Sequence, residues 1–139
     1  ETITYDSKTY IVTAIDSFAA FGCEKLIVVN MPNTIKKIES YAFYFASLED
    51  IVIPDGVEVI ESMAFADMFY QTLTIGKSLK AIDISALAGS SQLVKIEISP
   101  CNPYYTSGNH CNAIIERRTG KLVLGCRNNS THLCKDYRR

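Results

Sequence analysis

Six side chains in the C-terminal part of the chain are of types that bind metals. They are Cys101, His110, Cys111, Cys126, His132 and Cys134. A structural zinc site holds its ion with four converging nitrogen or sulfur donors, which usually come in pairs spaced C-x2–4-C. The sequence has no such pair, and only His132 and Cys134, two residues apart, are spaced to present two donors from one extended segment. The sequence therefore weighs against a metal site, and we expect neither a metal nor another cofactor.

The sequence offers fewer candidate catalytic residues than candidate metal ligands. His110 and Cys111 are a base and a nucleophile in adjacent positions, but neighbours on a strand point to opposite faces of it. The sequence lacks the motifs of serine hydrolases, zinc proteases and phosphate-binding loops. We therefore expect no catalytic residues and no enzymatic activity.

The composition argues against two classes of partner. Of the 139 residues, 14 are Lys or Arg and 15 are Asp or Glu, so the net charge of −1 provides no basic field for nucleic acid. No apolar run approaches the ~18 residues of a membrane-spanning helix, so we expect no membrane insertion in this segment. A hydrophobic fraction of 47% is ordinary for a folded protein, and the length suits a single domain over residues 1–139.

An internal repeat supplies the elements that would position any site. Residues 35–56 (IKKIESYAFYFASLEDIVIPDG) align without a gap on residues 57–78 (VEVIESMAFADMFYQTLTIGKS), at an offset of 22. Ile38 then meets Ile60, and Phe43 meets Phe65. Less regular copies lie on both sides, which makes about four repeats of 22–23 residues over residues 13–100. Periods of about 20–29 residues are typical of leucine-rich repeats, whose coils stack into a solenoid.

Each repeat has two halves with different patterns. The first half is L-x-x-I-x-I, as at Leu48, Ile51 and Ile53, and its alternation predicts a strand with one buried face. The second half, I-x-x-x-A-F, is too short for an ordinary helix, so we expect Phe43 and Phe65 to turn inward and anchor the core. The predicted fold is a repeat solenoid with a parallel β-sheet on its concave face, mostly strand and loop and poor in helix.

The first repeat and the loops carry further expectations. The placement of Leu26, Val29 and Met31 in the same pattern predicts another strand over residues 26–31. Cys23 aligns with Phe45 in the loop before it and is interpreted as a small buried hydrophobe. Tyr44, Phe45 and Phe69 near these loops are apolar beyond the needs of the repeat, so they either pack between coils or form a sticky patch.

Both ends of the stack need a cover, because the last coils of a solenoid expose apolar core. Residues 1–12 predict an N-terminal β-hairpin cap that turns at Asp6-Ser7-Lys8, and residues 101–139 predict a C-terminal β-hairpin and tail. A four-residue loop in the second hairpin would set Glu116 opposite Lys121. The same register sets Cys111 opposite Cys126, so the two thiols either form a disulfide or remain a buried free pair.

The predicted strands also define a candidate protein-binding face. In each strand, the residues on either side of the first Ile of I-x-I should point outward. These are Val28, Asn30, Asp50, Val52, Thr72, Thr74, Lys95 and Glu97. The set mixes apolar, hydroxyl and charged groups, without the aromatic column that would suit sugar rings or the basic column that would suit phosphates. It is either a face for a protein partner or simply the solvated side of the sheet.

The repeats resemble those of the BspA-like leucine-rich repeat family, whose members run L-x-x-I-x-I-P-x-x-V-x-x-I-x-x-x-A-F. The likeness covers roughly residues 12–100, and the segments N-P-Y-Y at 102–105 and C-N-A-I-I at 111–115 are also similar to the family. Gly76 in place of the Pro and Leu87 in place of the Phe depart from the pattern.

The resemblance implies a secreted or cell-surface protein of a bacterium or a protist, with a binding role. We therefore expect a monomeric module that recognises extracellular or host proteins, for example in adhesion. Two alternatives remain open at this point. One is a purely structural spacer or stalk in a larger surface protein, and the other is a glycan-binding module.

Overall fold

The computed structural model describes residues 2–108 and 112–125 and consists there of β-strands and loops, without a helix. The strands are β1 (Thr2–Tyr5), β2 (Lys8–Ile11), β3 (Ala14–Ile15), β4 (Lys37–Ile38), β5 (Asp50–Ile53), β6 (Val59–Ile60), β7 (Thr72–Ile75), β8 (Ala81–Ile82), β9 (Lys95–Ile98), β10 (Tyr105–Thr106), β11 (Ala113–Glu116) and β12 (Leu122–Gly125).

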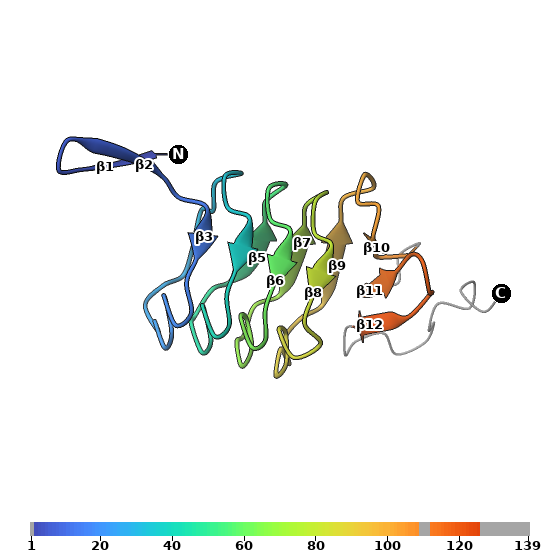
Figure 1. The fold of residues 1–139 in the computed structure, drawn as a ribbon. Helices are drawn as coiled ribbons and strands as arrows, with labels where there is room; N and C mark the ends of the chain where they lie inside the picture. Colours follow the sequence, from blue (N-terminus) through green and yellow to red (C-terminus); the bar gives the residue numbers. More distant parts are fainter. Residues whose placement is uncertain (1, 109–111, 126–139) are drawn as a thin grey trace.

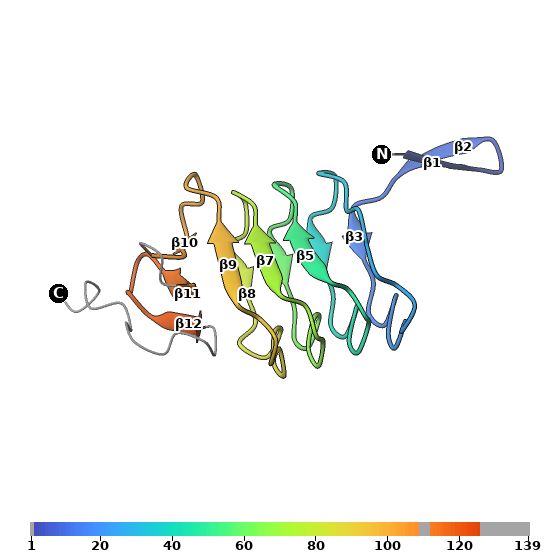
Figure 2. The ribbon, with the colours of Figure 1, turned by 180° about the vertical axis from the view of Figure 1, so that it is seen from behind.

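The repeats stack as the coils of a solenoid with a parallel sheet on each side (Figure 1). Strands β5, β7 and β9 form what we call the long-strand sheet, which faces the viewer in Figure 2. Strands β3, β4, β6 and β8 form the short-strand sheet on the other side. The parallel sheet expected from L-x-x-I-x-I is thus confirmed, and the two-residue strands of the short-strand sheet are an addition that the sequence pattern did not indicate.

The register of both sheets follows the repeat. Asp50 pairs with Thr72, and Lys37 pairs with Val59, each one repeat apart. The four segments that lead from each short strand toward the next long strand form what we call the lower loops, at the bottom of Figure 1. They comprise residues 16–26, 39–49, 61–71 and 83–94.

The core lies between the two sheets and the lower loops. Phe43 and Phe65 are 3% and 0% exposed, and their rings stack with centroids 5.1 Å apart. Ala42 and Ala64 beside them are fully buried, and backbone bonds such as Phe43 N–H to Ala64 O join successive loops. The expectation that these phenylalanines anchor the core is confirmed.

The first coil differs from its prediction in two respects. Residues 26–31 form no strand, because only one backbone bond, from Glu49 N–H to the Ile27 carbonyl, joins this segment to the start of β5. Cys23 is exposed rather than buried. The reason is an extra residue in this coil: Gly22 makes the loop bond that Phe45 makes in the next coil, so Cys23 does not take the place of Phe45.

The N-terminal hairpin is present but does not lie over the first coil. Tyr5 pairs with Lys8, so the turn consists of Asp6 and Ser7 alone, both at positive φ. Every residue of β1 and β2 is exposed, and the hairpin extends away from the coils in Figure 1. The expected role as a cover is therefore not seen at this end.

The C-terminal hairpin packs against the last coil through β11, where Ala113, Ile114 and Ile115 are buried. Glu116 N–H donates to the Lys121 carbonyl, as the four-residue loop predicted. The register then shifts by one residue between Ile114 and Ile115, so the strictly regular pairing predicted from the loop does not hold along the whole hairpin. Cys111 and Cys126 lie outside the described residues, and their disulfide stays a prediction.

Candidate functional site

The structure brings six of the eight predicted face residues together on the long-strand sheet. Asp50, Thr72 and Lys95 lie side by side on β5, β7 and β9, and Val52, Thr74 and Glu97 form a second row. We call these six residues the long-strand face. Val28 and Asn30 are exposed as predicted, but they belong to the segment without a strand and so do not extend the rows.

Polar contacts within the long-strand face contribute little to stability. The Thr72 hydroxyl donates to the Asp50 carboxylate, and Lys95 Nζ lies 2.8 Å from Glu97 Oε1. Lys95 and Glu97 are 53% and 57% exposed, and an ion pair so exposed contributes about 0–1 kcal/mol. The folded state therefore hardly depends on these charges, which leaves them available to a partner.

A groove of about 500 Å³ runs across the carboxyl ends of the three long strands. It is lined by Val52, Ile53, Pro54, Asp55, Thr74, Ile75, Gly76, Glu97, Ile98, Ser99, Pro100 and Ser107. One residue from each strand of the long-strand face, namely Val52, Thr74 and Glu97, contributes to its wall. The face is thus a sheet surface with a hollow at one end.

Asn102, two residues after the groove residue Pro100, fixes the chain beside the groove. Its side chain is buried, and Nδ2 donates to the carbonyls of Gly76 and Leu79 at 2.9 and 3.1 Å. Its Oδ1 accepts the backbone N–H groups of Tyr104 and Tyr105 at 2.8 and 2.9 Å. All four bonds that an amide side chain usually makes are present, so the N-P-Y-Y segment is a structural turn that fixes the chain around Pro100.

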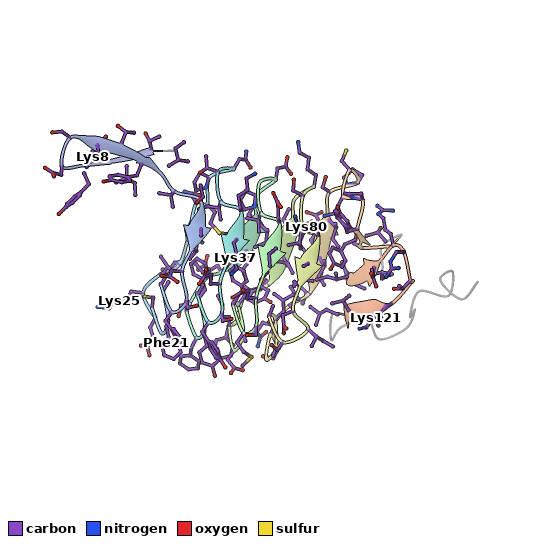
Figure 3. The ribbon with its side chains drawn as sticks, viewed as in Figure 1. Lys8, Phe21, Lys25, Lys37, Lys80 and Lys121 are labelled. Atoms are coloured by element: carbon purple, nitrogen blue, oxygen red, sulfur yellow. The ribbon has the colours of Figure 1, made fainter. Side chains whose placement is uncertain are left out.

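The lower loops carry an aromatic surface. Phe18 stacks on Tyr41, and Phe21 stacks on Tyr44, each pair with ring centroids 5.3 Å apart. The neighbouring contacts Phe18–Phe21 and Tyr41–Tyr44, at 5.7 and 5.5 Å, join the pairs into a block of four rings that we call the aromatic block. Figure 3 shows Phe21 at the lower end of the first coil.

The sequence predicted only part of this surface, namely Tyr44, Phe45 and Phe69, and not Phe18, Phe21 or Tyr41. The available signal was the recurrence of an aromatic residue at an offset of 23 from Phe18 to Tyr41 and from Phe21 to Tyr44. The extra residue in the first coil hid this recurrence from an alignment at 22.

The short-strand sheet carries a ladder of ion pairs. Lys37 Nζ lies 2.7 Å from Glu61 and 3.4 Å from Glu39, and Lys80 Nζ lies 2.6 Å from Glu58. Figure 3 shows Lys37 and Lys80 on this side of the coils. The hydrogen bond with Glu61 raises the pKa of Lys37, and the same bond lowers the pKa of Glu61. The mutual pairing of these charges suits a structural role.

Most of the candidate metal ligands lie outside the described residues. Of the six candidate metal ligands, Cys101 is described and exposed, and the other five lie outside the described residues. Within residues 2–108 and 112–125, no three His, Cys, Asp or Glu side chains form a group that could hold a metal ion. The described chain also has no helix with the length and apolarity needed to cross a membrane.

Comparison with known protein families identifies the type of the repeats. The family model of the BspA type leucine-rich repeat region, with six copies, matches residues 9–114. No curated protein matches the chain at a significant level.

Two solved structures are similar to the chain. A leucine-rich repeat protein from Bacteroides ovatus ATCC 8483 is 21% identical with a TM-score of 0.46, over 71% of this chain and 32% of that one. A leucine rich cell surface protein from Faecalibacterium prausnitzii A2-165 is 17% identical with a TM-score of 0.44, over 87% of this chain and 51% of that one. The chain thus spans about a third and about half of their lengths.

Proposed function

Since this chain belongs to the BspA type leucine-rich repeat family, we propose that it is a recognition module of a secreted or cell-surface protein and binds an extracellular or host protein. The partner contacts the long-strand face, and no chemical reaction is involved. The location and the adhesive role rest on the family, whereas the choice of surface rests on the geometry described above.

One observation carries the choice of surface. The six side chains of the long-strand face stand in two regular rows, in register across three strands, although the core needs none of them. A rigid sheet positions its side chains more reproducibly than a loop does, which favours a preorganised contact. Because stacked coils extend such rows across the solenoid, this arrangement suits recognition of a protein surface better than of a small molecule.

The charges of the face suggest how a partner is oriented. Asp50 lies on β5 at one side of the sheet, and Lys95 and Glu97 lie on β9 at the other. Val52, on β5 with Asp50, is 56% exposed and provides an apolar contact on that side. Opposite charges on a partner would set its orientation and speed its association more than they would raise its affinity.

Binding to an array of extracellular host proteins and glycans tests the proposal. We expect the immobilised chain to retain at least one protein. Retention of glycans alone would make it a glycan-binding module, and retention of nothing would leave the spacer function; either result contradicts the proposal.

Two variants then locate the binding surface. Asp50→Ala and Lys95→Ala should each weaken binding of the retained protein about two- to fivefold, the range expected for charges at the rim of an interface. Lys8→Ala, which removes a lysine from the exposed β2, is the matched control and should have no effect. Unchanged binding by both face variants would contradict the choice of surface.

A further inference from the structure

We infer that a pocket in the lower loops, separate from the long-strand face, binds an arginine side chain of a protein partner. The pocket has a volume of about 330 Å³ and is lined by Glu24, Phe45, Ala46, Ser47, Asp67 and Phe69. It contains none of the six residues of the long-strand face. It draws its walls from the first three coils and lies beside the aromatic block, since the Phe45 and Tyr44 ring centroids are 6.4 Å apart.

The pocket combines two carboxylates that have no cationic partner among the described residues. None of the ion pairs in residues 2–108 and 112–125 includes Glu24 or Asp67. Asp67 Oδ2 instead accepts the Tyr44 hydroxyl at 2.6 Å, which orients the carboxylate without neutralising it. That hydrogen bond raises the pKa of Tyr44, so the phenol stays a donor. The negative charge of the pocket therefore favours binding of a cationic group from a partner.

The pocket also offers two exposed rings. Phe45 and Phe69 are 49% and 67% exposed, although phenylalanine is among the residue types most often buried in folded proteins. A guanidinium group stacks on such a ring and pairs with a carboxylate at the same time. An ammonium group is more strongly hydrated and lacks the flat face, so the combination favours arginine over lysine.

Two pocket residues occupy a backbone position that is left-handed in all four coils. Phe45 and Asp67 lie at φ of 58° and 52°, the left-handed region that side chains disfavour. The equivalent positions in the neighbouring coils are Gly22 and Gly89, at φ of 64° and 73°, which adopt this conformation without penalty. Phe45 and Asp67 both line the pocket, together with Glu24 of the first coil. At this position the two coils therefore add a ring and a carboxylate to the pocket, where the neighbouring coils have no side chain.

Titration with two peptides of identical sequence, one with arginine and one with the uncharged isostere citrulline, tests the proposal by calorimetry. We expect the arginine peptide to bind and the citrulline peptide to bind at least about threefold more weakly. Phe69→Ala and Glu24→Gln should each weaken arginine binding about three- to fivefold. Both residues are exposed, so neither change should disturb folding.

Two controls carry the same chemical changes away from the pocket. Tyr5→Ala removes an exposed ring, and Asp6→Asn removes a carboxylate, both from the projecting N-terminal hairpin. Neither should alter binding of the arginine peptide. Equal binding of the citrulline peptide, absence of binding by the arginine peptide, or equal loss in the controls and the pocket variants would each overturn the proposal.

Discussion

At the scale of single residues, the stability of this protein depends on side chains that recur once per coil. Phe43 and Phe65 stack face to face at the centre of the core, with Leu87 continuing the column in the next coil. A single substitution here therefore leaves a void between coils rather than a local gap at a surface.

We predict that Phe65→Ala lowers the free energy of unfolding by about 3–5 kcal/mol, because Phe65 is 0% exposed and its removal leaves a cavity. Urea denaturation followed by circular dichroism measures this change. Phe69→Ala, in which a ring that is 67% exposed is removed, should change the same quantity little. Similar values for the two variants would contradict the register assigned to the repeat.

The buried polar side chain of Asn102 also contributes to stability. We predict that Asn102→Ala costs about 2–4 kcal/mol, because the part-buried N–H of Tyr104 and the buried N–H of Tyr105 lose their acceptor. The exposed Asn30→Ala should lie within about 0.5 kcal/mol of the parent protein. Chemical denaturation of both variants checks the difference, and an Asn102→Ala variant as stable as Asn30→Ala would refute the assignment of a structural turn.

The pairing of Lys37 with Glu61 makes stability depend on pH. The pKa of Glu61 is lowered from its ordinary value of 4.5 in the folded state, chiefly by its hydrogen bond with Lys37. The stabilisation is thus fully present above pH 4.5 and is lost as the pH falls through the folded pKa.

Glu61→Gln should therefore lose less stability than the parent protein on acidification from pH 7 to below 4.5. Lys37→Met should have the same effect, since it removes the partner that lowers the pKa of Glu61. Melting temperatures across this range measure the loss. An identical acid loss in all three proteins would show that the pair does not contribute.

At the scale of elements, the turns between long and short strands pack backbone against backbone. A Cβ added at Gly56 would lie 1.8 Å from the Asn33 carbonyl oxygen in the preceding coil, and one added at Gly76 would lie 2.7 Å from the Asp55 backbone. This close approach accounts for Gly76, where the repeat otherwise has proline.

We predict that Gly56→Ala destabilises the protein by about 1–3 kcal/mol, because the neighbouring backbone has to move to admit the methyl group. Gly125→Ala is the matched control, since no atom lies within 4 Å of its added Cβ and its φ is not positive. Thermal unfolding compares the two. Equal melting temperatures would contradict the close packing of the turns.

At the scale of the whole molecule, the sequence predicted the features that depend on periodicity. Burial at Ile51, Ile53, Leu73 and Ile75 follows from alternation within each repeat, and the long-strand sheet follows from the constant offset. The rows of the long-strand face were predictable for the same reason, because a strand alternates its side chains between two faces.

Features that depend on backbone geometry between coils were not predictable in this way. The short-strand sheet arises from backbone bonds between turns, and two-residue strands have no sequence period. The pocket of Glu24, Phe45 and Phe69 combines residues from three coils whose spacing an extra residue makes irregular. The exposed N-terminal hairpin has the alternation of a capping hairpin, but its contacts with the coils depend on tertiary packing.

The most direct test of recognition through the long-strand face is a hydrogen-exchange footprint of the protein bound to the partner that the array identifies. The proposal predicts that binding slows exchange in β7 and β9 and around the groove residues Gly76 and Ser99. Exchange in β1 and β2 should remain unchanged. Slowed exchange confined to that hairpin or to the short-strand sheet would contradict the central claim.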